Sequence, residues 1–266
     1  MGDASPLLWG AEAYGMYRSI STQAIVIRRE RLGEFHKSLT LLTSDLGLIS
    51  AAAYGAYKMH SHLRVGSEPF TWSTTVLYHN PVKKSYKVTD LDIRESFPGL
   101  QSDLSRMAAA SLWAEVVQKS FGAGETSSML FRLFLDCLRL LNAPDLVREP
   151  YVTIQFLWRF LSLAGYQPET KTCERCGAAH GHTQSAYYSS LSNAILCPSC
   201  RGPRDDMLPA GSLRYLDAIS VLPLDRSIEV RLEPAGLRAL RETLPRMVQS
   251  VLEAELASLR WVGAPR

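Results

Sequence analysis

Four cysteines arranged as two close pairs restrict this chain more than any other feature of its sequence. Cys173 and Cys176 form the first pair, Cys197 and Cys200 form the second, and twenty residues separate the two pairs. Two residues between thiols allow a tight turn to direct both sulfurs at one centre, and the intervening length suffices for a β-hairpin that returns the second pair to the first. The spacing therefore predicts a four-sulfur metal site.

Zn²⁺ matches this ligand set best, because four soft thiolates saturate its tetrahedral shell and leave no open position. Saturation indicates one structural ion, whose binding is coupled to folding of the segment. The alternatives are two reduced dithiols or one redox-active pair, but neither pair sits at the strand-to-helix turn typical of redox motifs. His180 and His182 lie between the pairs, and one of them could replace a sulfur, but four cysteines already fill the shell. The fifth cysteine, Cys137, lies in an apolar helix and is expected to pack in a core.

The composition is that of a folded, soluble protein. Of the 266 residues, 46% are hydrophobic, which is enough for substantial cores, and 21% are charged. These values exclude a disordered tail, a collagen-like fibre and a charge-dominated histone-like protein. No uncharged apolar run reaches the about 18 residues of a membrane span, and the N-terminus lacks the layout of a secretory signal. Because the paired cysteines also fit a reducing compartment, we expect a cytoplasmic protein with no membrane partner.

The sequence pattern changes after a short N-terminal segment. Residues 1–21 have no clear period and are interpreted as an N-terminal extension. From Thr22 onward, β-branched and aromatic runs separated by turns predict five strands, at 24–27, 38–43, 48–53, 71–78 and 85–88. Five short strands with no helical period between them predict a small, closed or partly closed β-barrel over residues 22–96.

Apolar residues recur at helical spacing beyond Pro98. They predict helices at 100–116, 129–141, 151–164, 212–222 and 234–251. The first three belong to a helical domain at 97–170, the last two to its C-terminal part at 205–266, and the cysteines lie between, at 171–204. The fold class predicted from the residues is therefore α+β and multidomain, with a β-barrel, an α-helical bundle and an inserted four-cysteine zinc-binding segment.

Positive charge is concentrated in the strand region. Between residues 28 and 87, nine basic residues stand against four acidic ones, a local surplus of five in a chain of formal net charge +3. The basic residues are Arg28, Arg29, Arg31, Lys37, Lys58, Arg64, Lys83, Lys84 and Lys87. A cationic barrel that also carries aromatic residues fits single-strand nucleic-acid binding, in which phosphates lie in a basic groove and bases stack on rings. An ordinary solvated surface with core aromatics fits the same composition.

Sequence motifs of catalysis are missing. The chain has no Gly-rich phosphate loop, no His-Glu-x-x-His and no Gly-x-Ser-x-Gly. The histidines of the strand region have no carboxylates in motif spacing. We therefore expect no enzymatic activity, and a zinc-ribbon enzyme that acts on nucleic acid is a less favoured alternative.

Several segments, taken in order, resemble one known family. They are Ala24–Arg28, Gly33–Glu34, Leu39–Thr43, Gly47–Ser50, Gly55–Ala56, Pro69–Phe70 and Leu163–Pro168. Over roughly residues 22–262 the chain resembles the bacterial RecO recombination mediators. The resemblance implies an N-terminal OB-fold at 22–96, a helical bundle and a zinc-binding insert within it. The chain departs from the family at Phe35-His36, at Tyr54 and Tyr57, which replace a usually basic stretch, and at Asn193-Ala194.

The resemblance also implies a function. RecO proteins bind single- and double-stranded DNA, anneal complementary strands and, with RecR, help RecA replace single-strand-binding protein (SSB) on DNA; many contact the SSB C-terminal tail. In such a nucleoid-associated protein, the nine basic residues would contact phosphates, and Tyr54 or Tyr57 would stack on a base. The alternative is a protein-binding scaffold that docks RecR and the SSB tail and has weak DNA affinity of its own.

Overall fold

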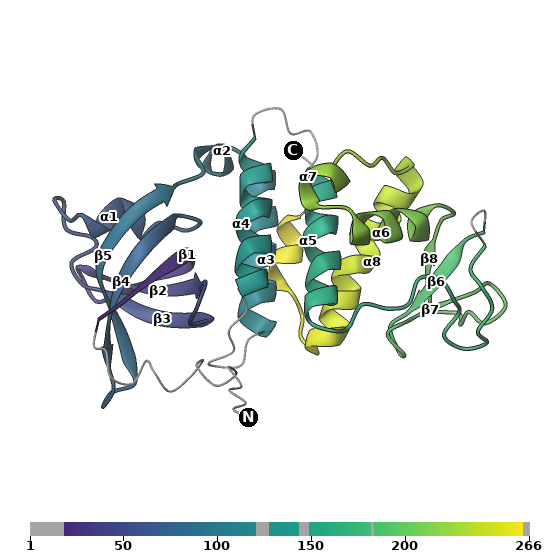
Figure 1. The fold of residues 1–266 in the computed structure, drawn as a ribbon, viewed down its shortest axis with the longest axis horizontal. Coiled ribbons are helices and arrows are strands. Elements are labelled where there is room, and N and C mark those ends of the chain that lie inside the picture. Colours follow the sequence, from purple (N-terminus) through teal and green to yellow (C-terminus); the bar gives the residue numbers. More distant parts are fainter. Residues whose placement is uncertain (1–18, 121–127, 144–148, 182–183, 263–266) are drawn as a thin grey trace, which may run out of the picture. The chain divides into compact units, whose positions relative to one another are not determined.

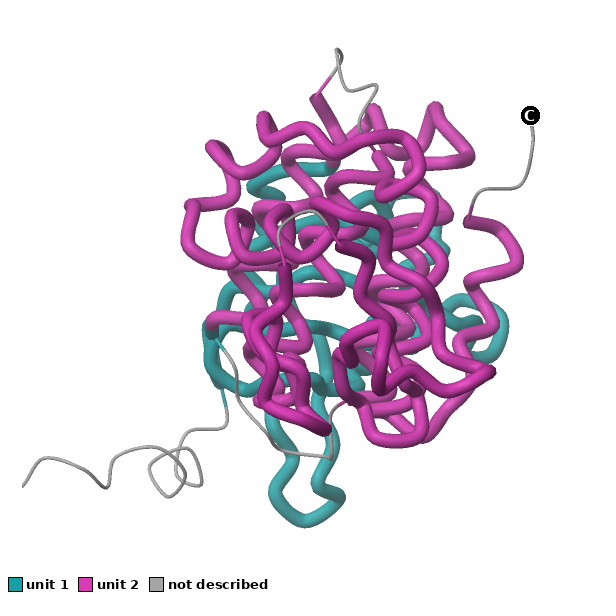
Figure 2. Tube along the Cα trace, turned by 90° about the vertical axis from the view of Figure 1, so that its right-hand side faces the viewer, with its two compact units in different colours: residues 1–96, 123–128 teal, residues 97–122, 129–266 magenta. Residues whose placement is uncertain are grey.

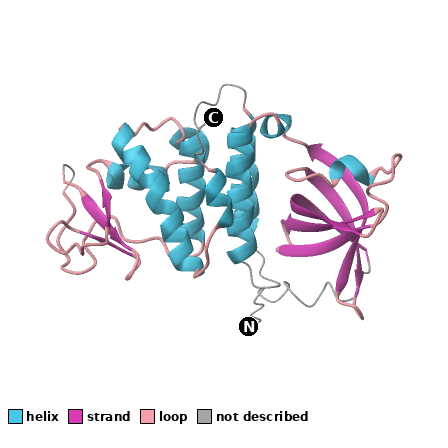
Figure 3. Cartoon of the chain, turned by 180° about the vertical axis from the view of Figure 1, so that it is seen from behind, coloured by secondary structure: helices cyan, strands magenta, loops and turns pink. Residues whose placement is uncertain are grey.

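The chain folds into two compact units, which are coloured separately in Figure 2. The computed structural model describes residues 19–120, 128–143, 149–181 and 184–262. The first unit holds β-strands up to residue 96, and the second holds helices and a small three-stranded sheet (Figures 1 and 3). Residues 1–18 of the predicted N-terminal extension lie outside the described residues. Its last three residues, from Ser19 on, already belong to the first strand.

Five strands close the barrel of the first unit in the order β1-β2-β3-β5-β4. They are β1 (Ser19–Leu32), β2 (His36–Thr43), β3 (Leu48–Ala53), β4 (Trp72–Asn80) and β5 (Ser85–Glu95). Neighbouring strands are antiparallel except β3 and β5, which pair in parallel at Ala51–Tyr86 and Ala52–Lys87. With the short helix α1 (Leu63–Gly66) between β3 and β4, this is the OB-like barrel that the sequence predicts.

Alternating side chains fill the barrel. The core takes Val26 from β1, Leu39 and Leu41 from β2, Leu77 from β4 and Val88 from β5, together with smaller residues between them. The pairing of β1 with β2 shifts register between Val26 and Arg28, as at a β-bulge. Beyond this shift the end of β1 is exposed, so its charged side chains lie on the surface.

The second unit is built around packed helices and an aromatic cluster. The helices are α2 (Pro98–Gln101), α3 (Leu104–Ser120), α4 (Ser128–Asn142), α5 (Glu149–Leu163), α6 (Ser212–Val221), α7 (Leu224–Ser227), α8 (Pro234–Leu252) and the 3₁₀ helix η2 (Ala257–Trp261). Trp113 of α3 stacks on Phe156 of α5 with ring centroids 5.0 Å apart, and Phe134 of α4 meets both rings edge-on. Cys137 is fully buried, which confirms that it packs in the core.

The cysteine segment forms a sheet of three short strands in the order β7-β6-β8. The hairpin of β6 (Ala186–Ser189) and β7 (Ala194–Leu196) is the one predicted between the cysteine pairs. The third strand, β8 (Asp206–Leu208), lies beyond the predicted end of the segment at residue 204 and pairs with β6. No local pattern marks so short a strand, because it forms only by this long-range pairing.

None of the helices in the described residues is both long and apolar enough to cross a membrane.

Candidate metal centre and nucleic-acid interface

The four predicted ligand cysteines converge on one point. The sulfurs of Cys173, Cys176, Cys197 and Cys200 all lie within 4.8 Å of one another, and the Sγ atoms of Cys176 and Cys197 are 3.7 Å apart. A tetrahedral ion with metal–sulfur bonds of about 2.3 Å would hold its sulfurs about 3.8 Å apart. The four side chains therefore have the spacing and the donor chemistry to hold one metal ion.

Each cysteine pair lies in a tight turn held by backbone hydrogen bonds. In the first turn the Gly177 N–H donates to the Cys173 carbonyl, and the Cys173 N–H donates to the Ala178 carbonyl, both at 2.8 Å. In the second, the Cys200 N–H donates to the Cys197 carbonyl at 3.0 Å. Gly177 has a φ of +70°, which favours glycine and explains why one follows the first pair directly.

The surroundings of the sulfurs change how readily they ionise. Burial raises the pKa of the Cys173 thiol. Hydrogen bonds to its sulfur from the backbone N–H groups of Cys197, Cys176 and Arg175 lower the pKa by more than burial raises it, so that the pKa falls to about 6. This thiol is therefore available as a thiolate ligand at neutral pH. Hydrogen bonds to the other sulfurs, first of all that of Cys176, and burial together raise the pKa of Cys200 to about 12. A cation among the sulfurs opposes that effect, because it stabilises every thiolate that contacts it.

A side chain of the first cysteine turn is hydrogen-bonded to the second cysteine turn. Arg175 Nη1 donates to the Cys200 carbonyl at 2.6 Å, so the two cysteine turns are joined independently of any ion. In the part of the chain that the structure describes, the only potential ligands gathered at this point are the four cysteines, and His180 is not one of them. His182, the other histidine considered as a ligand, falls outside the described residues.

On the barrel, the turn after β3 packs against the β1–β2 hairpin. The Tyr57 N–H donates to the Phe35 carbonyl at 3.1 Å, and the Gly55 N–H donates to His36 Nδ1 at 2.8 Å. These bonds place Tyr54 and Tyr57, which are 52% and 38% exposed, beside the hairpin. We call the resulting surface the loop cluster; it comprises Arg31, Phe35, His36, Tyr54, Tyr57, Lys58 and Lys87.

Cations of the loop cluster lie against its rings. Lys87 Nζ is 5.4 Å from the centroid of the Tyr54 ring, and Arg31 Cζ is 6.0 Å from that of Tyr57. The Tyr54 ring also meets the His36 ring edge-on at 5.0 Å. Exposed rings next to exposed charges are the arrangement that bases and phosphates of a single strand require.

Two of the predicted phosphate contacts are engaged by carboxylates. Arg28 lies 2.6 Å from Glu30, and Arg29 lies 3.2 Å from Glu68. Their charge is therefore partly compensated within the barrel, and they contribute less to the potential outside it.

Three further predicted contacts are exposed and are not part of the loop cluster. Arg64 lies on α1, and Lys83 and Lys84 lie in the turn between β4 and β5. None of the three forms an ion pair with a carboxylate that the structure describes. Their charge is therefore available to a partner.

Lys37 is not available as a phosphate contact, which corrects the prediction. Its side chain is fully buried, and Nζ donates to Ser67 Oγ at 2.7 Å and to Glu68 Oε1 at 2.9 Å. The Tyr57 ring covers it, with its centroid 5.0 Å from Nζ. The physical reason is the alternation of β2, which turns Lys37 inward on the same side as Leu39.

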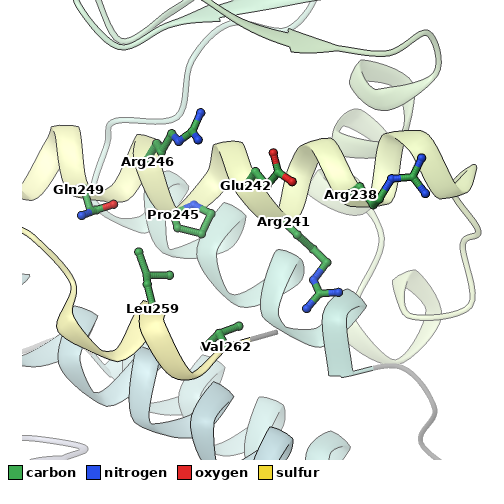
Figure 4. Close-up of a pocket in the computed structure, with 8 residues that line it drawn as sticks. All are labelled: Arg238, Arg241, Glu242, Pro245, Arg246, Gln249, Leu259 and Val262. Atoms are coloured by element: carbon green, nitrogen blue, oxygen red, sulfur yellow. The ribbon is translucent and has the colours of Figure 1, made fainter. Parts of the chain in front are cut away.

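The second unit has a groove whose position the sequence does not indicate. It has a volume of about 460 Å³ and lies between α8 and η2. Figure 4 shows Arg241 and Pro245 of α8 facing Leu259 and Val262 across it. Its other lining residues are Arg238, Glu242, Arg246 and Gln249. The groove thus combines an apolar wall with positive charge, and it arises only when the C-terminal segment folds back.

Comparison with known proteins identifies the family. The sequence model of the family described as Recombination protein O N terminal matches residues 16–97. The family model described as Recombination protein O C terminal matches residues 101–260. The DNA repair protein RecO of Roseiflexus sp. is 31% identical over 94% of this chain and 87% of its own length. That of Desulforudis audaxviator is 30% identical over 92% of this chain and 98% of its own length. That of Acetivibrio thermocellus is 33% identical over 68% of this chain and 70% of its own length. The chain therefore belongs to the RecO family of DNA repair proteins.

Proposed function

We propose that this protein is a DNA-binding mediator of repair and recombination that works by binding and not by chemical turnover. It binds single- and double-stranded DNA, anneals complementary strands and, with RecR, helps to load RecA onto SSB-coated single strands. In the bacterial cell it acts in the cytoplasm, at the nucleoid. The observation that carries this proposal is the loop cluster, in which exposed cations and exposed rings lie side by side on an OB-like barrel.

The barrel offers a path along which a single strand of DNA can lie between the loops. OB-folds bind oligonucleotides across the face of their second and third strands and the adjoining loops. Here the outward positions of β2 and β3 carry small residues, with Ser38 paired to Ala52 and Thr40 paired to Ser50. Ala52 in turn pairs with Lys87 of the loop cluster. A nucleic-acid backbone can lie close to these four positions, because their own side chains are short.

The roles within the loop cluster follow from its contacts. Tyr54 stacks on a base, while Lys58 and Lys87 contact the flanking phosphates. Because these contacts involve the sugar–phosphate backbone and the faces of bases, binding is largely independent of sequence. Neutralising the phosphates of two strands lowers the repulsion between them and thereby favours annealing.

We further propose that the four cysteines hold one structural Zn²⁺. A full shell of thiolates supports this choice of metal, since it suits a soft tetrahedral ion and leaves no position for a substrate. The ion ties the turns of Cys173 and Cys197 together and so stabilises the sheet of β6, β7 and β8.

Replacing Tyr54 by Leu tests the DNA-binding proposal. We expect Tyr54→Leu to weaken binding of a single-stranded oligonucleotide about tenfold, the loss of one base stack, as measured by fluorescence anisotropy. Tyr166→Leu is the matched control, because Tyr166 is 55% exposed and lies outside the barrel. Equal affinities of the two variants would contradict the proposal, as would wild-type protein that neither binds nor anneals DNA.

A second candidate function is that of a protein-binding scaffold with weak DNA affinity, and the groove between α8 and η2 favours it. Arg238 and Arg241 can pair with carboxylates while Leu259 and Val262 contact an apolar side chain. We assign the C-terminal tail of SSB to this groove. Arg241→Glu is expected to abolish binding of a tail peptide and to leave affinity for single-stranded DNA unchanged. Unchanged peptide binding would remove the groove as the docking site.

A further inference from the structure

The turn between β4 and β5 is an exposed arm with a fixed shape. The last pair of the β4–β5 ladder joins Asn80 to Ser85, and the Asn80 side-chain oxygen accepts the N–H groups of Val82 at 3.1 Å and Lys83 at 3.0 Å. An asparagine that holds the turn in this way restricts the conformations of the tip. In Figure 1 the two strands run together past the rest of the barrel to this turn.

The base of the arm is braced by aromatic rings. His79 and Tyr86 are opposite each other across the strand pair, and their rings are stacked with centroids 4.8 Å apart. The next pair joins Tyr78 to Lys87, whose Nζ lies over the Tyr54 ring at 5.4 Å. The arm is therefore connected directly to the loop cluster.

The tip of the arm is apolar and its surroundings are cationic. Val82 is 92% exposed and follows Pro81, which is exposed as well. Lys83 and Lys84 come next, and the sequence has no acidic residue from position 69 to position 89. Isolated apolar residues are common on protein surfaces. Here, however, two consecutive ones lie in the turn of a braced hairpin, next to lysines that form no ion pair with a carboxylate that the structure describes.

We propose that this tip, Pro81–Val82, inserts between stacked base pairs of duplex DNA while Lys83 and Lys84 hold the adjacent phosphates. This inference rests on the proposed DNA-binding function and adds the mode by which duplex DNA is engaged. Proteins that deform a duplex insert apolar side chains, proline among them, at a base step and partly unstack it. A compact valine with no ring acts as such a wedge and not as a stacking platform. The arm would thus open a step of the duplex beside the loop cluster, where a single strand is held.

A duplex that contains 2-aminopurine, whose fluorescence increases when the base is unstacked, tests the inference. We expect the full-length protein to increase this fluorescence on binding, and Val82→Ser to lose most of the increase while its affinity for single-stranded DNA and the salt dependence of that affinity stay unchanged. Val65→Ser is the matched control, because Val65 is 62% exposed on α1 of the same unit, and it should behave as wild type. Lys83→Ala and Lys84→Ala should each reduce the salt slope of duplex binding by about 1.

The outcomes separate this inference from the proposed function. If wild-type protein binds single-stranded DNA but causes no increase of fluorescence in the duplex, or if Val82→Ser and Val65→Ser behave alike, the wedge is overturned and the DNA-binding function stands. If Val82→Ser retains the fluorescence increase but weakens binding to RecR, the tip is a protein contact and the wedge is again overturned. Wild-type protein that binds neither single-stranded nor duplex DNA at low salt would overturn the proposed function together with the wedge.

Discussion

Lys37 Nζ lies 2.9 Å from Glu68 Oε1, inside the barrel and beneath the ring of Tyr57. Nζ also donates to Ser67 Oγ at 2.7 Å and to the Arg64 carbonyl at 3.2 Å. The ammonium is thus paired and surrounded by acceptors, as a buried charge must be. It joins β2 to the end of α1 and supports the turn that presents Tyr57 in the loop cluster.

Removing the Lys37 charge should change stability and not the number of phosphate contacts. Lys37→Met removes the donor of Ser67 Oγ and the buried partner of Glu68, while the Arg64 carbonyl keeps its bond from Ser67 Oγ. We therefore expect a loss of about 2 kcal/mol in the free energy of unfolding, measured in urea. The salt slope of DNA binding should not change. Lys58→Met is the matched control, because Lys58 is exposed: its stability should stay within about 0.5 kcal/mol of wild type, and its salt slope should fall. A reduced salt slope in Lys37→Met would show that Lys37 reaches phosphates.

Loss of one thiolate should release the metal. Cys176→Ser leaves three sulfur ligands, so we expect purified variant protein to contain little zinc and its cysteine segment to be sensitive to proteolysis, because metal binding and folding are coupled. Metal content is measured by mass spectrometry. Cys137→Ala serves as control, because Cys137 is buried among the helices and should keep the wild-type metal content. Wild-type protein that is free of metal when made under reducing conditions would refute the structural ion.

The contact between Arg175 and Cys200 should control how firmly the ion is held. Arg175→Ala removes the bond from Nη1 to the Cys200 carbonyl, and we expect affinity for zinc to fall about tenfold, as measured by competition with a coloured chelator. Arg204→Ala, an exposed arginine of the same segment, should release zinc as wild type does. If the two variants release zinc equally, the bond does not position the second cysteine turn.

Glu115 should make stability depend on pH. Its carboxylate accepts the N–H groups of Ala257 at 2.9 Å and Ser258 at 2.8 Å, at the start of η2. Burial raises the pKa of this carboxyl, but the bonds from Ser258 and Ala257 and the charge of Lys119 together bring the pKa below its ordinary value of 4.5. A group with a lowered pKa in the folded state stabilises the fold above its ordinary pKa, and this contribution is lost as pH falls through the lowered pKa. We therefore expect Glu115→Gln to be less stable than wild type at neutral pH.

The stability difference between Glu115→Gln and wild type should narrow on acidification, because the wild-type carboxyl then becomes protonated. Urea unfolding at neutral pH and below the lowered pKa of Glu115 measures this difference. A difference that is the same at both pH values would mean that the negative charge of Glu115 plays no part in holding η2.

Much of the architecture follows from local sequence patterns. The β-branched run at 24–27 and the Asn80-Pro81 turn place strands and a hairpin where the structure has them, and Gly165 ends α5 with a φ of +77°. The spacing of the cysteines alone predicts their convergence, because a metal site requires fixed intervals along the chain. Features that depend on distant pairing are different. The strand β8 and the groove between α8 and η2 exist only in the folded chain, and no local signal indicates them.

Lys37 shows how a signal that is present can be outweighed by residue type. Its position two residues before Leu39 and four before Leu41 puts it on the inward side of a strand, and this alternation predicts burial. A lysine is nonetheless counted as a surface charge, since it is seldom buried without a partner. That partner, Glu68, is thirty-one positions away in sequence, so only the folded barrel reveals it.

Whether the exposed cations of the barrel hold DNA phosphates is tested most directly by the affinity of the wild-type protein for a single strand as a function of salt. Each phosphate contact contributes a slope of about −0.7 to a plot of log affinity against log salt. With contacts from Arg31, Lys58, Lys83, Lys84 and Lys87, we predict a slope of about −3.5 between about 50 and 200 mM salt. A flat response, or no binding at the lowest salt, would contradict a phosphate-binding barrel.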